Sequence, residues 1–295
     1  MSRSFPEISV CVITFNHEQF ITEAINSILA QKIDVPYEIV ISDDCSTDRT
    51  RTLCQELADH HPSVINLLPE KENLGITGNF YRALSSCRGR YIAVCEGDDY
   101  WIDDRKLAMQ YSFLEENAGY GLVYTDVEIK NTTTEVLSRP RYYAGEVFDR
   151  LLQGNFINTL TVFFRKELPE LSSVSSKQLR YAFDHFYWLR IAAVSRIFYM
   201  PEKSGCYRIH GNNFFLTGRI TSKDERQKLY PEFIMDSIHF FLDRNDEQQI
   251  IRVSRKVLLR KYFSSLYNAG ISFKEFRYIW KILKLICRPG RRSDF

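Results

Sequence analysis

Short β-branched runs alternate with segments of helical periodicity through the first hundred residues of this 295-residue chain. The strand-like runs are ISVCVIT, YEIVISD, SVINLLP and RYIAVCE, which begin at residues 8, 37, 63 and 90. Between the first two runs, apolar side chains from Phe20 to Leu29 recur at the spacing of one helix face. Strands that alternate with helices in this way predict an α/β fold, with a mixed, mostly parallel sheet and helices on both faces.

The later parts of the chain continue this pattern and then change. Further helical patterns run over residues 105–117, 145–155 and 184–195, and strand patterns over 120–130, 159–168 and 196–211. Two local features are also predicted: a helix from an N-cap at Ser46 to Ala58, and a turn from Glu202 to Gly205. From about Leu229 onward the pattern is almost entirely helical, which predicts an α/β domain over residues 1–217 and a helical extension over 218–295.

Composition excludes several classes of protein. A hydrophobic content of 44% and a charged content of 26% lie in the globular range. No stretch approaches the 18 apolar residues of a membrane span, and the first residues lack the pattern of a secretory signal. We therefore expect a cytoplasmic protein whose seven cysteines, which include no C-x-x-C pair, are reduced packing residues.

The last part of the chain is strongly basic, with 12 Lys and Arg against 2 acids from Arg252 onward. These charges alternate with Leu, Ile, Phe, Tyr and Trp. Two interpretations stay open: a helical pair that packs on the α/β domain with its basic face in water, or a peripheral surface on anionic lipid at the inner face of the membrane. No nucleic-acid-binding motif accompanies the charge, so nucleic acid is not expected as a partner.

Polar residues follow three of the predicted strands. The first strand ends in TFN, the second in SDDCSTD and the fourth in CEGDDYW. Ligands of open α/β sheets bind outside the carboxyl ends of the strands. We therefore expect these three segments to converge on one crevice.

The segment SDDCSTD has two interpretations. Its acids are compatible with a helix N-terminus, where negative charge is favoured. Alternatively, Asp43 or Asp44 accepts a hydrogen bond from a ligand donor, such as a base imide or a ribose hydroxyl, because a carboxylate is an acceptor only.

The segment CEGDDYW is harder to explain as a helix cap. Two carboxylates about 4 Å apart repel by roughly 4 kcal/mol at an effective dielectric of 20, so a bound cation is expected among its three acids. Oxygen ligands favour Mg²⁺ or Mn²⁺, and a divalent ion in turn makes a diphosphate the natural ligand.

The order VITFN, SDDCSTD, ENLG, CEGDDYW, FDHFYWLR and YRIHG resembles glycosyltransferase family 2 over about residues 6 to 215. This resemblance implies the GT-A fold and an inverting, metal-dependent transfer of a sugar from a nucleotide diphosphate sugar, with a UDP-sugar as the expected donor. Mn²⁺ or Mg²⁺ is the implied cofactor.

The resemblance also implies which residues bind the nucleotide. Thr14, Phe15 and Asn16 match the loop that lies against the base, and Asp44 matches the carboxylate that binds the pyrimidine ring. Asn73 matches a further nucleotide contact.

The segment from Glu96 to Asp98 matches the D-x-D motif of the family. Its first acid, here Glu96, contacts the ribose in the family, and its second, Asp98, holds the metal. Asp99 is a second metal ligand, a sugar contact or a structural residue. The chain departs from the family pattern in having Glu at the first acid and Ile13 in place of a common proline.

The last two matching segments supply the base and a metal contact. Asp184 resembles the catalytic base of the family, although Phe183 replaces the usual Glu before it; the alternative is a helix N-cap. His185 is expected to be structural. His210 matches a His that ligates the metal or contacts the diphosphate, and Arg208 is a second candidate for diphosphate neutralisation.

We therefore interpret the chain as a hexosyl- or N-acetylhexosaminyltransferase that acts on a bacterial surface glycan, such as capsule or lipopolysaccharide, free or lipid-linked. There are two alternatives. A nucleotidyltransferase would carry a Gly-rich, Lys-containing loop after the first strand, which VITFNHEQF lacks. A non-catalytic glycan-assembly protein on the same fold is the other alternative.

Overall fold

The computed structural model describes residues 5–69, 72–131, 142–167 and 183–211, together with positions 237, 260, 263, 264 and 280. The predicted boundary after residue 217 and almost all of the predicted helical extension lie outside the described residues. The division into two parts therefore stays a prediction.

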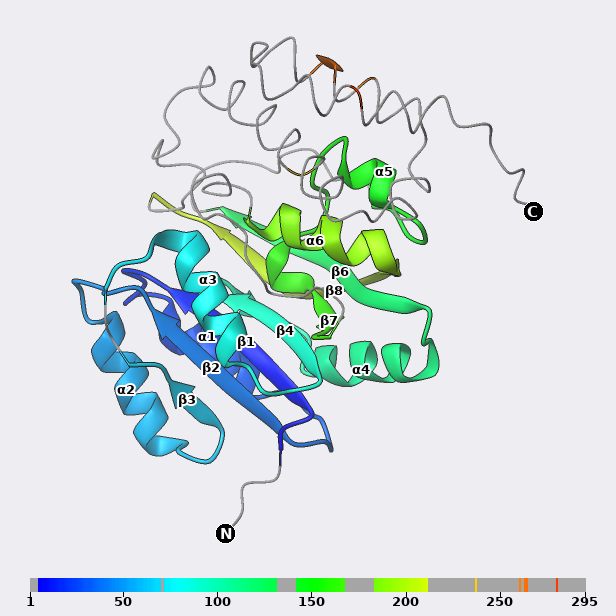
Figure 1. The fold of residues 1–295 in the computed structure, drawn as a ribbon. Helices are drawn as coiled ribbons and strands as arrows, with labels where there is room; N and C mark the ends of the chain where they lie inside the picture. Colours follow the sequence, from blue (N-terminus) through cyan, green and yellow to red (C-terminus); the bar gives the residue numbers. More distant parts are fainter. Residues whose placement is uncertain are drawn as a thin grey trace.

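Within the described residues, the strands form one mixed sheet in the order β3-β2-β1-β4-β7-β6-β8-β5 (Figure 1). The strands are β1 Ile8–Thr14, β2 Tyr37–Asp43, β3 Ile65–Leu67, β4 Tyr91–Glu96, β5 Tyr100–Trp101, β6 Tyr120–Asn131, β7 Phe163–Arg165 and β8 Arg196–Ile209. Four pairs of neighbours are parallel and three are antiparallel. The mixed, mostly parallel α/β sheet predicted from the sequence is thus confirmed.

Helices cover both faces of this sheet (Figure 1). They are α1 Ile21–Leu29, α2 Thr50–His60, α3 Gly75–Ser86, α4 Lys106–Glu116, α5 Phe148–Leu151 and α6 Phe183–Val194, with a 3-10 turn η1 at Thr159–Thr161. One apolar cluster includes side chains of α3 and α6, and a second includes side chains of α1, α2 and α4. Successive residues of β1 alternate between the two clusters, as side chains on a pleated strand must.

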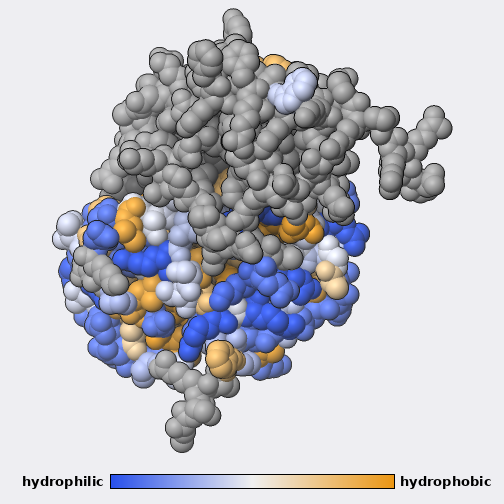
Figure 2. Space-filling view, viewed as in Figure 1, coloured by the Kyte–Doolittle hydropathy of each residue, from blue (hydrophilic) through white to orange (hydrophobic). Residues whose placement is uncertain are grey.

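The described surface in the view of Figure 2 is mostly hydrophilic, with apolar residues in small groups. Among the described residues, we find no helix with the length and apolar character that a membrane crossing requires.

Several predicted elements were wrong in detail. The strand predicted over 159–168 is reduced to β7, Phe163–Arg165, because Thr159–Thr161 form the 3-10 turn η1. Helix α2 begins at Thr50 instead of following a cap at Ser46, because the Ser46 hydroxyl donates to Asp43 and so belongs to the preceding loop. The turn predicted from Glu202 to Gly205 is part of the continuous strand β8, which accommodates its extra residues by register shifts against β6. The helix predicted over 145–155 is limited to the short α5.

Lys106 is the one lysine among the described residues that is fully buried. Its ammonium group donates to Gln110 Oε1 at 2.7 Å and lies 4.4 Å from the centre of the Trp101 ring. Burial lowers its pKa from 10.5 to about 7. A charged Lys106 is therefore costly in the folded protein.

We expect the stability of the protein to depend on pH through this side chain. Between pH 7 and about 10 the unfolded chain binds a proton that the folded protein has released, so folding becomes more favourable as pH rises. Lys106→Met should therefore stabilise the protein most below pH 7, and its advantage should shrink by on the order of 4 kcal/mol by pH 10. Urea unfolding of both proteins at several pH values measures this difference.

Lys203→Met is the matched control, because Lys203 is exposed on β8. It should not reproduce the pH-dependent advantage of Lys106→Met. A constant difference between wild type and Lys106→Met would contradict the assignment of a lowered pKa to Lys106.

Candidate active site

The segments that follow β1, β4 and β8 meet at the carboxylate of Asp98. His210, directly after β8, lies with Nε2 3.2 Å from Asp98 Oδ2. His17, in the loop after β1, lies with Nε2 3.7 Å from the same oxygen. The two imidazole rings are perpendicular, with centres 6.3 Å apart. The structure thus brings the predicted pair Asp98 and His210 together and adds His17, which the sequence analysis missed.

Opposing effects set the protonation of Asp98 and of His17. Burial raises the pKa of Asp98, but the hydrogen bond with His210 and the electrostatic influence of the nearby His17 and His210 outweigh it and leave the pKa lowered. Burial lowers the pKa of His17, although Asp98 opposes that shift. The site therefore favours an ionised carboxylate beside a neutral His17.

Gly97 is required by the packing of the β1 loop against this segment. A Cβ atom on Gly97 would lie 2.6 Å from Thr14 Oγ1 and 3.0 Å from His17 Nδ1. Thr14 is buried, and its hydroxyl lies 3.2 Å from His17 Nδ1. The side chain of Thr14, predicted as a nucleotide contact, is therefore engaged with His17.

Asp99 and Arg208 join the segment after β4 to strand β8. The backbone N–H of Arg208 donates to Asp99 Oδ1, and the Arg208 guanidinium donates to the backbone oxygen of Asp98, both at 2.8 Å. That guanidinium also pairs with Glu23 and lies over the ring of Tyr100. Burial and the charge of Asp98 raise the pKa of Asp99 well above its ordinary value. This geometry favours the structural alternative for Asp99.

Glu96 and Asp184 are buried carboxyl groups whose charges affect each other. Glu96 Oε2 is buried without a hydrogen-bond partner, and burial, Asp98 and Asp184 together raise the pKa of Glu96 to about 8. Asp184 Oδ2 accepts hydrogen bonds from Asn155 Nδ2 at 3.0 Å and Thr159 Oγ1 at 3.1 Å, and burial raises its pKa. The polar groups of Asn155 and Thr159 orient this carboxylate, and sequence spacing offered no signal for them.

The neighbouring His185 makes a different kind of contact. Its Nε2 lies 2.7 Å from the backbone oxygen of Leu151, and burial lowers its pKa to about 4. His185 is thus a neutral packing residue that joins α6 to α5.

The loops after β1 and β2 are tied together. The Asn16 N–H donates to Ser46 Oγ, and the Thr47 N–H donates to Asn16 Oδ1. Asn16 and Cys45 have φ angles of 57° and 63°, a conformation that Asn tolerates better than most residues. Phe15 lies half-buried in this region.

Asp43 has a different role from Asp44 and Asn73. Both carboxylate oxygens of Asp43 accept hydrogen bonds from Ser46. Asp44 Oδ1 accepts from the Leu74 N–H at 2.8 Å, and Asn73 Nδ2 donates to the backbone oxygen of Asp44 at the same distance. Asp43 therefore shapes the loop, while Asn73 holds Asp44 in place.

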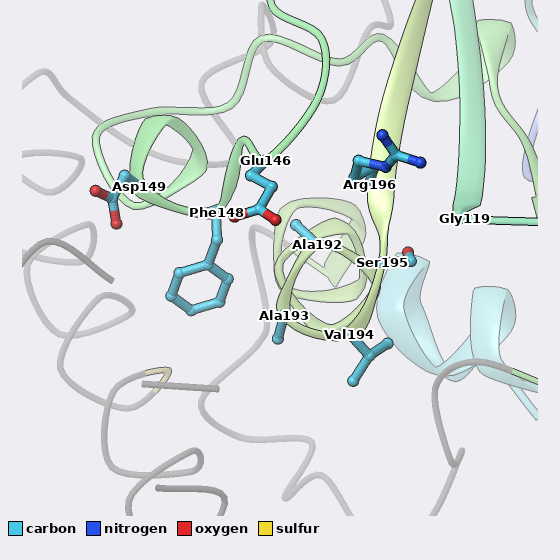
Figure 3. Close-up of a pocket in the computed structure, with 9 residues that line it drawn as sticks. All are labelled: Gly119, Glu146, Phe148, Asp149, Ala192, Ala193, Val194, Ser195 and Arg196. Atoms are coloured by element: carbon cyan, nitrogen blue, oxygen red, sulfur yellow. The ribbon is translucent and has the colours of Figure 1, made fainter. Parts of the chain in front are cut away.

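A separate cavity of about 300 Å³ lies at the far ends of α6 and β8 from these residues. It is lined by Gly119, Glu146, Phe148, Asp149 and residues 192–196 (Figure 3). None of the predicted site residues reaches it.

The donor set around Asp98 fits a divalent cation that also binds substrate oxygens. Among the described residues, no three His, Cys, Asp or Glu side chains form a ready-made metal cage. Mg²⁺ sites commonly use one or two carboxylates and take their other ligands from phosphates and water. One ionised carboxylate, two imidazoles and the unpartnered Glu96 Oε2 suit such an open site.

Asp99 should be replaceable by its amide without loss of stability. Asp99→Asn keeps an oxygen that accepts the Arg208 N–H, whereas Asp99→Ala leaves that N–H buried and unpaired at a cost of about 1–3 kcal/mol. Chemical unfolding at pH 7 measures both changes. Equal destabilisation by Asn and Ala would contradict the hydrogen-bonding role of Asp99.

Comparisons with known proteins agree with this geometry. Residues 9–171 match the model of the family described as glycosyl transferase family 2. An uncharacterised protein of Mycobacterium tuberculosis (Rv1520) is 31% identical over 214 residues, which are 70% of this chain. This chain spans 60% of the length of that relative.

Two further similarities are informative. TuaG of Bacillus subtilis, a putative teichuronic acid biosynthesis glycosyltransferase, is 29% identical over 70% of this chain and 81% of its own. The crystal structure of S. aureus TarS in complex with UDP-GlcNAc superposes with a TM-score of 0.62 over 95% of this chain and 80% of that chain, at 19% identity. At that identity the superposition establishes the fold alone.

Proposed function

Because the chain belongs to glycosyltransferase family 2 and has the GT-A fold, we propose that it transfers a sugar from a nucleotide diphosphate sugar, with inversion, at the site around Asp98. The observation that carries this proposal is the convergence of an ionised Asp98, two imidazoles and the buried carboxylates of Glu96 and Asp184. These groups provide a place for a diphosphate-bound cation beside an oriented base.

The donor binds along the loops after β1, β2 and β4. Phe15 and Asp44 contact the base, Thr14 and Asn73 hold those loops in position, and Glu96 contacts the ribose. Asp98 and His210 would hold Mn²⁺ or Mg²⁺, which when bound offsets the negative charge of the leaving diphosphate. A UDP-sugar is the proposed donor, supported by the binding of UDP-GlcNAc to TarS, which has the same fold.

Asp184 is the proposed general base. Its carboxylate accepts the proton of an acceptor hydroxyl while that oxygen forms a bond to the anomeric carbon. The bond from the anomeric carbon to the diphosphate breaks, and the nucleoside diphosphate leaves as an anion. Attack from the face opposite the leaving group inverts the configuration. Hydrogen bonds from Asn155 and Thr159 keep the carboxylate oriented for this step.

The proposed acceptor is a hydroxyl of a bacterial surface glycan, free or lipid-linked. The similarity to TuaG supports this class, since teichuronic acid is the glycan in its name. Contact of the basic segment after Arg252 with a membrane or with the α/β domain stays a proposal, because that segment lies almost entirely outside the described residues.

Removal of the metal carboxylate should abolish transfer. We expect UDP-sugars with Mn²⁺ to raise the melting temperature of the wild type, and Asp98→Ala to lose the Mn²⁺-dependent part of that rise and at least about 10²-fold in transfer rate. Differential scanning fluorimetry with UDP-, GDP- and dTDP-sugars, followed by transfer assays on each hit, measures both effects.

Glu116→Ala is the control, because Glu116 is exposed and lies at the end of α4. Normal transfer by Asp98→Ala would overturn the metal assignment. The absence of any shift with every nucleotide sugar would favour the non-catalytic alternative.

Loss of the proposed base should lower the rate of transfer without weakening donor binding. Asp184→Asn keeps the size of the side chain but cannot accept the proton, so we expect kcat to fall by about 10²–10⁴-fold. The thermal shift with donor and Mn²⁺ should stay as in the wild type. An unchanged kcat, or a parallel loss of donor binding, would remove Asp184 from the role of base.

A further inference from the structure

The proposed function counts His17 as one of the two imidazoles beside Asp98 but gives it no role of its own. Its side chain is 15% exposed, and its Nε2 lies 3.7 Å from Asp98 Oδ2. His210 directs Nε2 at the same oxygen from 3.2 Å, and its side chain is 12% exposed. His17 follows β1 and His210 follows β8, the first and last described strands along the chain, and both imidazoles face the same carboxylate oxygen.

The position of His17 is held at three points. Its backbone N–H donates to Thr50 Oγ1 at 2.8 Å, at the first residue of α2. Its ring nitrogen Nδ1 lies 3.2 Å from the buried Thr14 hydroxyl. Gly97 leaves the space that this pair occupies, because any Cβ at that position would collide with both. These three residues hold the edge of the ring that carries Nε2 toward Asp98.

The arrangement is that of a metal-ligating histidine. Such residues typically donate the N–H of the second ring nitrogen to an oxygen, which fixes the tautomer. When Nδ1–H donates to Thr14 Oγ1, the lone pair of Nε2 faces Asp98. Neighbouring ligands of an octahedral ion are about 3 Å apart, and Nε2 of His210 and Nε2 of His17 lie 3.2 Å and 3.7 Å from Asp98 Oδ2.

We propose that His17 is a third protein ligand of the divalent cation, beside Asp98 and His210. This inference rests on the proposed metal-dependent function and deepens it. Imidazole ligands favour transition metals, whereas Mg²⁺ prefers carboxylate, carbonyl and water oxygens. Two imidazoles with one carboxylate leave the other positions for diphosphate oxygens and water.

Direct metal binding by the full-length protein tests this proposal without any transfer assay. Titration with Mn²⁺ alone is followed by electron paramagnetic resonance. His17→Ala should weaken Mn²⁺ binding by at least about 10-fold. His61→Ala is the matched control, because His61 is exposed after α2.

A spectroscopic count of nitrogen ligands separates ligation from a structural role. Electron spin echo envelope modulation of bound Mn²⁺ should show two imidazole nitrogens in the wild type and one in His17→Ala. Thr14→Val should weaken the His17 signal, and Thr14→Ser should restore it. His17→Gln, which keeps the volume of the side chain, covers the case in which His17→Ala fails to fold.

The outcomes are distinguishable. One imidazole nitrogen in the wild type, unchanged in His17→Ala and His17→Gln, would overturn the inference and leave the proposed function intact. It would mean that His17 Nε2 donates a proton to Asp98 or to the diphosphate. A wild type that binds no Mn²⁺, with or without UDP, would overturn both the inference and the metal-dependent part of the proposed function.

Discussion

The contact of His17 and His210 with one oxygen of Asp98 is the interaction on which the site depends. These residues follow the first, fourth and eighth strands along the chain, so they meet only when β1, β4, β7, β6 and β8 have paired. The antiparallel strand β7 connects the parallel half to the part that carries β8. Formation of the site therefore depends on these five neighbouring strands.

Glu96, Asp98 and Asp99 lie within four positions, and their repulsion is tolerated because the pKa of each carboxyl is shifted differently. Asp98 stays ionised through its imidazole partners, whereas burial and the Asp98 charge raise the pKa of Asp99, which accepts the Arg208 N–H. Glu96 has a pKa of about 8, so it carries little charge at neutral pH in the free site. The repulsion is thus reduced before any ligand binds, and a cation would restore the charge of Glu96.

The sequence predicted what depends on local pattern. The parallel strands, most helices and the convergence of Asp98 with His210 followed from apolar periodicity, strand ends and family resemblance. His17 was missed because a histidine three residues after a strand carries no pattern of its own, and its ring is directed to Asp98 by contacts with Thr14, Thr50 and Gly97. Asp99 and Ser46 likewise depended on partners far away in sequence or on loop conformation.

The position of the cation is the most direct test of this account. Crystals of the protein grown with UDP and Mn²⁺ should give an anomalous diffraction peak within bonding distance of Asp98 Oδ2, with His210 Nε2 and the diphosphate oxygens around it. Its absence there with UDP bound, or a peak held by residues away from Asp98, would contradict the account.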